Sequence, residues 1–153
     1  MTDEINTSAE IAENSAIPRG RAVHAKADCA PTAEQEPLPP AIAKKPVEQK
    51  SPAEWAYQRL ILFIQNFEQS LDNEHEVAMG LTDTGAGVLR IEGLGYFDPD
   101  IVTFYGSDQT GSRVQLVQHV SQLNVLMRAT LKPETEQTAR RIGFELAKGL
   151  EDD

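Results

Sequence analysis

Few residues of this 153-residue chain are of the types that carry out acid–base or nucleophilic chemistry. Beyond residue 50 there are two histidines, His75 and His119, and no cysteine, because the single cysteine is Cys29. The sequence contains no HExxH pair, no paired CxxC and no phosphate-binding glycine loop. Asp98 and Asp100 flank a proline, as expected of a capped turn. We therefore predict a non-enzymatic protein with no catalytic residues, no metal and no cofactor.

The run RVQLVQHVSQLNVLM (113–127) carries four uncharged polar side chains within an apolar segment, namely Gln115, Gln118, Gln122 and Asn124, and also His119. One interpretation is that Gln118, Gln122 and Asn124 hold the backbone at a strand–turn–strand corner, since buried polar groups usually have local partners. The other is a neutral hydrogen-bonding surface for a base or another polar ligand. His119 is interpreted as a strand histidine and His75 as a solvated turn residue.

Arg140 and Arg141 form a basic cluster with Arg128 and Lys132 upstream. If these segments pair, the cluster is a candidate anion site for a phosphate or a carboxylate partner. The alternative is intramolecular salt bridging to the surplus acids. The chain has a net charge of −10, of which residues 51–153 contribute −8. This charge disfavours general binding of nucleic acids and of anionic lipid surfaces.

A helix is predicted to begin at SPAEWAYQRLILFIQNFEQSL (51–71). Ser51 is the expected N-cap, a proline follows at the first helical position, and Glu54 completes a capping box. Apolar residues recur at helical spacing and cover more than one face. The helix therefore either lies deep against a sheet or contacts another subunit.

After this helix the apolar period changes from that of a helix to that of a strand. Turn signals separate five predicted strands, and connections this short indicate an antiparallel meander. Glycines at 93 and 95 suggest a bulge or bend in the second strand. The strands are expected at 76–81, 88–97, 101–106, 113–120 and 125–131, with a turn at 82–87.

Both ends of the chain are harder to interpret. The segment RRIGFEL (140–146) alternates like a strand, although a helical pattern also fits it, and we predict a strand followed by a short helical tail. Residues 1–50 hold six prolines, ten alanines and no aromatic residue, so we predict a disordered Pro/Ala-rich tail. The predicted fold is one α+β domain over 51–150. It comprises an N-terminal amphipathic helix packed on a curved antiparallel meander of five to six strands.

The predicted location is the cytoplasm. The first residues have acids where a signal peptide needs bases, and no apolar run approaches the ~20 residues of a membrane span. No intrachain disulfide can form from one cysteine.

Two resemblances add to these patterns. The run from SPAEWAYQRL through VQLVQHVSQLNVL to RRIGFEL resembles an uncharacterised, mainly alphaproteobacterial domain family with no established activity. A more distant likeness is to bacterial Sm-like RNA chaperones, in which a helix precedes five strongly bent antiparallel strands and the chains assemble into rings. Leu94, Phe97 and Asp98 look like the first motif of that family, and VQHVSQL is similar to its histidine-containing second motif. Glu92 stands where that motif has glycine, and Gln118 where a lysine would help to hold RNA.

The expected function is that of a binding or assembly module whose partner is a second copy of the chain or another protein. The alternative is a Sm-like module that binds RNA or a nucleotide. The candidate ligand-binding residues are Tyr96, Phe97, Gln118, His119, Gln122, Asn124, Arg140 and Arg141.

Overall fold

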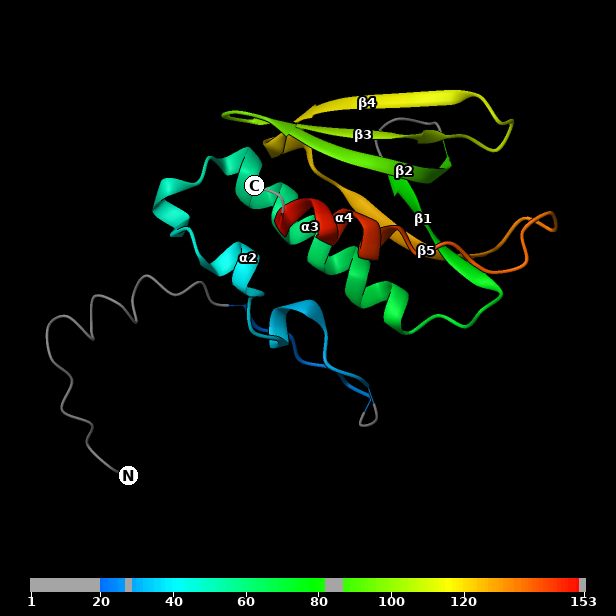
Figure 1. The fold of residues 1–153 in the computed structure, drawn as a ribbon, viewed down its shortest axis with the longest axis horizontal. Coiled ribbons are helices and arrows are strands. Elements are labelled where there is room, and N and C mark those ends of the chain that lie inside the picture. Colours follow the sequence, from blue (N-terminus) through cyan, green and yellow to red (C-terminus); the bar gives the residue numbers. More distant parts are fainter. Residues whose placement is uncertain (1–19, 27–28, 82–86, 152–153) are drawn as a thin grey trace, which may run out of the picture.

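A computed structural model describes residues 20–26, 29–81 and 87–151. In this part of the chain, helices cover one face of an antiparallel sheet (Figure 1). The α+β class and the five antiparallel strands predicted from the sequence are confirmed. No helix of the described residues is both long and apolar enough to cross a membrane. The elements are η1 (Ala33–Gln35), α2 (Pro40–Ala43), η2 (Val47–Gln49), α3 (Pro52–Gln69), β1 (His75–Leu81), β2 (Val88–Phe97), β3 (Ile101–Ser107), β4 (Arg113–His119), η3 (Val120–Gln122), β5 (Val125–Leu131) and α4 (Ile142–Glu151).

Helix α3 begins at Pro52, with the Ser51 hydroxyl accepting the backbone N–H of Glu54 at 2.9 Å. The second half of the expected capping box differs, because the Glu54 carboxylate pairs with Lys45 Nζ at 3.0 Å. The apolar surface of α3 is broad because the sheet covers one part of it and α2 and α4 cover another. Ala53, Ala56 and Ile64 pack on the sheet, and Ile61 packs with residues of α2 and α4. The chain itself therefore covers the second face.

The strand order of the sheet is β4-β3-β2-β1-β5. The predicted meander is correct for β1 to β4 and wrong for β5, which pairs with β1 over its whole length, from His75↔Leu131 to Leu81↔Val125. The physical reason is curvature. The sheet bends so strongly that η3 carries the chain from β4 across to the free side of β1 (Figure 1). Both β4 and β5 are consequently edge strands.

Strand β2 is the element at which the sheet bends. Its first residues pair with β1, and nearly its whole length pairs with β3. The register between β2 and β3 shifts between Ile91 and Gly93, which confirms the predicted bulge. Across this shift the apolar side chains of β2 stay on the helix side, where Leu89 and Ile91 are buried. The turn predicted at 82–87 lies almost entirely outside the described residues.

Residues 29–50 differ from the predicted disordered tail, of which residues 1–19 and 27–28 lie outside the description. The physical reason is a small second core. Ile42 of α2 is fully buried against Ile61 and Leu150, so this short segment gains apolar contacts despite its prolines. Lys50, also buried, donates its Nζ protons to Ile42 O at 2.7 Å and to Gln58 Oε1 at 2.6 Å. These contacts tie the segment to α3.

The C-terminal segment is the helix α4, so the predicted sixth strand at 140–146 is wrong. Ile142, Leu146 and Leu150 lie on one face and pack against the core and α3. The helix begins at a partner that is distant in sequence. The buried Glu68 carboxylate of α3 accepts the backbone N–H groups of Ile142 and Gly143, each at 2.8 Å. This long-range cap favours the helical alternative over the strand.

Candidate functional site

The sheet face that points away from the helices carries a row of side chains across three strands. Phe97 of β2 pairs with Ile101 of β3, which pairs with His119 of β4. Phe97 is 76% exposed, and the His119 side chain is 48% exposed. We call Phe97, Ile101 and His119 the outer row. It brings together two of the residues that the sequence singled out, Phe97 and His119.

The same outer face carries two further exposed apolar or aromatic side chains beside this row. Tyr105 and Val117 are 42% and 56% exposed. A Cβ atom at Gly93 or Gly95 would meet the Tyr105 side chain at ordinary contact distance, so the tyrosine ring lies over these two glycines. The glycines of β2 therefore make room for an aromatic side chain on the outer face, which is a further role beside the bulge.

His119 is held in place by its neighbours. Its Nε2 lies 3.2 Å from Asp100 Oδ2, and its Nδ1 lies 2.8 Å from Ser121 Oγ. The Asp–His–Ser order is that of a nucleophile with its base, but Nδ1 also accepts the backbone N–H of Ser121 at 3.1 Å, as in a helix cap. Gln122 Oε1 accepts the backbone N–H of His119 at 2.9 Å. The bond to Gln122 is of the kind that the corner interpretation predicts, and the bonds of the His119 ring are those of a strand histidine with local partners.

The candidates Gln118, Asn124 and Tyr96 do not lie together on one surface. Gln118 and Tyr96 point to the helix side, Gln118 being 7% exposed and Tyr96 lying 5.0 Å from Tyr57 between ring centroids. The Gln118 Oε1 atom is buried without a hydrogen-bond partner in the described residues. Asn124 is exposed next to β5. The sheet therefore separates Tyr96 and Gln118 from the outer row by its own thickness.

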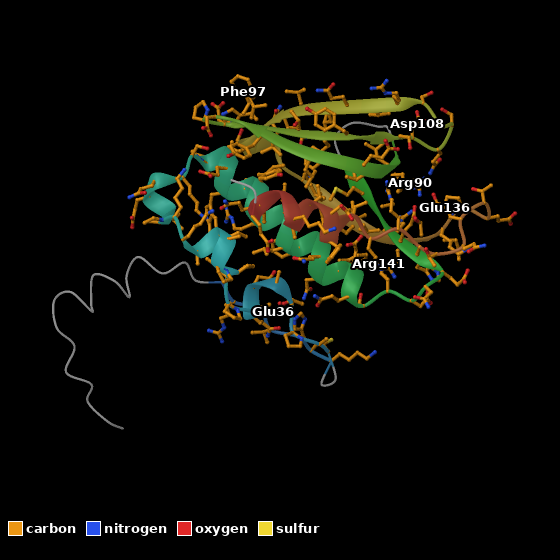
Figure 2. All side chains as sticks on the ribbon, in the orientation of Figure 1. Glu36, Arg90, Phe97, Asp108, Glu136 and Arg141 are labelled. Carbon is orange, nitrogen blue, oxygen red and sulfur yellow. The ribbon has the colours of Figure 1, made fainter. Side chains whose placement is uncertain are left out.

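Arg141 lies well apart from Phe97, beside the start of α4 (Figure 2). Its guanidinium donates to backbone carbonyls of the loop after α3 and of the first residue of β1, including Asp72 O at 2.7 Å and His75 O at 2.8 Å. These bonds occupy the donors that an anion would need. No local sequence signal indicates this role, because the carbonyls belong to residues almost seventy positions away.

Arg140 belongs to a charged cluster with Glu76, Arg90 and Glu136. Arg90 donates to Glu76 Oε1 at 2.7 Å and to Glu136 Oε1 at 2.8 Å. Burial disfavours the charged form of Arg90, but its bonds to Glu136 and Glu76 outweigh burial and raise its pKa. For Arg140, burial and the nearby Arg90 lower the pKa. Two nitrogens of Arg140 are buried and have no hydrogen-bond partner among the described residues. Arg90 is thus paired with two acids of the same chain. Arg140 and Arg141 do not converge on one open site.

The open edges of the sheet are the second feature with functional potential. In the described chain no strand pairs with the outer edge of β4 or of β5, and each strand is seven residues long. Each strand contains one charged residue, Arg113 in β4 and Arg128 in β5, and neither contains proline or lysine. Leu126 and Leu131 of β5 are 52% and 71% exposed. Monomeric proteins usually protect such edges with lysine, proline or bulges.

Sequence reasoning missed two features. The capping carboxylate Glu68 is buried, which raises its pKa, although the N–H groups of Gly143 and Ile142 and the charge of Arg141 oppose that shift. A groove beside Trp55 was also missed, although Trp55 and Arg59 stand four positions apart and so share one helix face. Within the described residues no cluster of histidine, cysteine and acidic side chains has the arrangement of a metal site.

Comparison with known proteins gives one match. A family model described as "Family of unknown function (DUF6173)" matches residues 45–145, which is more than half of the chain. The chain therefore belongs to this family. The searches of curated proteins and of solved structures gave no match.

Proposed function

We propose that this member of the DUF6173 family is a non-enzymatic assembly module that forms homo-oligomers through its sheet edges. The observation that carries the proposal is the pair of unprotected edges on β4 and β5. Both edges are seven residues long, both are nearly free of charge, and they lie at opposite ends of one sheet. Pairing of β4 of one copy with β5 of the next would satisfy the open backbone groups of both.

Such a contact is heterologous, because two different edges meet. Heterologous contacts form rings when the rotation between copies closes. The bend of the sheet supports closure, since β4 and β5 leave the bend in different directions (Figure 1). The exposed side chains of Val117 on β4 and Leu126 on β5 would lose water at the contact and add apolar burial to the backbone hydrogen bonds.

The test is the native mass of the full chain, measured by light scattering after size exclusion. We expect a multiple of 16.8 kDa for the wild type. Val117→Lys and Leu126→Lys place a charge beside each edge on side chains that are already solvent-exposed, so both variants should fold and shift to the monomer mass. Phe144→Lys on α4, which is 58% exposed and distant from both edges, is the matched control and should keep the wild-type mass.

Mixing the two edge variants sharpens the test. The Val117→Lys protein keeps an intact β5 edge, and the Leu126→Lys protein keeps an intact β4 edge. If the contact is heterologous, the mixture forms a dimer of one copy of each and nothing larger. A monomeric wild type would refute the proposal, and loss of assembly in only one of the two variants would refute the β4–β5 pairing.

A second candidate function is binding of RNA or a nucleotide by a Sm-like module. The outer row favours it, because Phe97 is exposed for stacking with a base and stands in register with His119, whose neighbours fix its orientation. The order of a helix followed by five bent antiparallel strands supports the likeness to the Sm-like family. The net charge of −10 opposes it.

Fluorescence anisotropy of labelled oligouridine and oligoadenine tests this second function. Binding that weakens about tenfold in Phe97→Ala would support it, since stacking on an aromatic ring contributes about 1–3 kcal/mol per base. Tyr105→Ala, on the same face outside the outer row, is the control. Absence of salt-sensitive binding, or equal loss in both variants, would refute it.

A further inference from the structure

A shallow groove of about 420 Å³ lies between the first half of α3 and η3. Trp55 and Ala56 of α3 line it, with Val47 from the preceding segment and with Val120 and Leu123 from the η3 region. Its surface is mainly apolar, and its volume falls in the range of small-molecule sites. The groove is separate from the outer row, because its lining belongs to the helix side of the sheet.

Two cations lie against the indole ring of Trp55. The Lys50 Nζ is 4.9 Å from the ring centroid, and the guanidinium carbon of Arg59 is 4.5 Å from it. Arg59 donates one bond from Nε to the backbone oxygen of Trp55 at 3.2 Å, which leaves the two terminal nitrogens of its fork. Neither cation forms an ion pair with a carboxylate in the part of the chain that the structure describes.

Among the described residues, no carboxylate bonds to the ammonium group of Lys50. Lys50 is 8% exposed, and its two hydrogen bonds go to neutral oxygens of Ile42 and Gln58. Burial lowers its pKa, although the field of Glu54 opposes this. Glu54 itself pairs with Lys45. The lining of the groove thus contains two cations and no acid, in a chain with a net charge of −10. A buried cation without a counter-ion, as Lys50 is, is costly, and an anion in the groove would offset that cost.

We propose that this groove binds a small organic monocarboxylate that carries an apolar or aromatic group. The apolar group packs against the aliphatic side chains of Val47, Val120 and Leu123 beside Trp55, and the carboxylate accepts two bonds from the terminal nitrogens of Arg59. A guanidinium fork matches a carboxylate in shape. A single guanidinium at the open rim matches a single negative charge, whereas a phosphate would need further donors at the same place. Lys50, enclosed beside the ring, adds a favourable field without direct contact.

Trp55 is the only tryptophan of the chain, so its fluorescence reports on the groove directly. The full chain is titrated with phenylpropanoate, phenylpropanol and acetate. Phenylpropanoate is expected to give a saturable change with a dissociation constant on the order of 1 mM, the range of ligands of this size. Phenylpropanol, which lacks the charge, should bind at least tenfold more weakly. Acetate, which lacks the apolar group, should give no saturable change.

Arg59→Met keeps the aliphatic stem over Trp55 and removes the fork. It should weaken phenylpropanoate binding about tenfold and leave phenylpropanol unchanged. Arg21→Met is the matched control at an exposed arginine outside the groove and should bind as the wild type does. Equal binding of the acid and the alcohol by the wild type would overturn the proposal without any variant. So would an absence of saturation with phenylpropanoate, or an Arg59→Met protein that binds it normally.

Discussion

Replacing Gly143 by alanine is expected to destabilise the chain, because α4 lies close against α3 at this residue. An added Cβ would lie 2.5 Å from Glu68 Oε1, 2.8 Å from Gln65 Cα and 3.0 Å from Gln65 N. Two of these three atoms are backbone atoms of α3, which cannot rotate away as the end of a side chain can. The start of α4 must therefore move outward from α3.

The size of the effect follows from three contributions. Overpacking at such a contact costs about 1–3 kcal/mol. An outward shift breaks at least one of the two bonds from Ile142 N–H and Gly143 N–H to the Glu68 carboxylate, each 2.8 Å long, at about 1.5–3 kcal/mol for a charged acceptor. Alanine has the higher helix propensity, which offsets about 1 kcal/mol. The expected net loss in free energy of unfolding is therefore about 3 kcal/mol.

Gly149→Ala is a control of identical chemistry in the same helix. No atom lies within 4 Å of a Cβ added there, so only the helix propensity changes and stability should rise by up to about 1 kcal/mol. Both variants are compared with the wild type by urea unfolding, followed by circular dichroism at one protein concentration. If Gly143→Ala is as stable as the wild type, or if both variants shift alike, the close contact between α3 and α4 is not as described.

Three further predictions concern other structural contacts. Burial raises the pKa of Glu68, so the contribution of this group to stability is full below its unfolded pKa and is lost as pH rises through its folded pKa. In urea unfolding from acid to neutral pH, the stability of the wild type relative to Glu68→Gln should therefore fall. A rise with pH would contradict this. Arg141→Met should lower the free energy of unfolding by about 3 kcal/mol, measured by thermal or urea unfolding, because four backbone carbonyls lose their donor. Arg128→Met, at an exposed arginine, should change this free energy by less than about 0.5 kcal/mol. Equal effects would count against the role of Arg141. Gly106→Ala would push a Cβ into the backbone oxygen of Arg90 in the neighbouring strand, so we expect a loss of at least about 3 kcal/mol, and a variant with wild-type stability would show that β2 and β3 are further apart.

Local sequence signals were sufficient for most elements of the fold. The start of α3 follows from Ser51 and the proline after it, because an N-cap acts within one turn of its own helix. The five strands follow from an apolar period of two between turn residues, and their observed bounds differ from the predicted ones by at most one residue at either end. The bulge in β2 follows from its glycines. All of these signals act between residues that are close in sequence.

The features that were predicted wrongly depend instead on residues that are distant in sequence. The pattern at 140–146 fits a strand and a helix equally well, and Glu68, more than seventy positions away, decides for the helix by capping it. Ile42 looks like part of a polar, proline-rich tail until Ile61 and Leu150 cover it. The pairing of β5 with β1 depends on the bend of the whole sheet.

The same division holds for the candidate sites. Residue type and the resemblance to Sm-like proteins identified Phe97 and His119 as candidates for binding, and composition indicated that the charge of the chain disfavours nucleic acids. Only the tertiary structure aligned these two residues across three strands and placed Tyr96 and Gln118 on the other face. It also paired Arg141 with backbone carbonyls and brought both Lys50 and Arg59 to within 5 Å of the centre of one indole ring. Sequence determines which groups a chain carries and their local periodicity, whereas distances between remote groups are determined by packing, which no local pattern encodes.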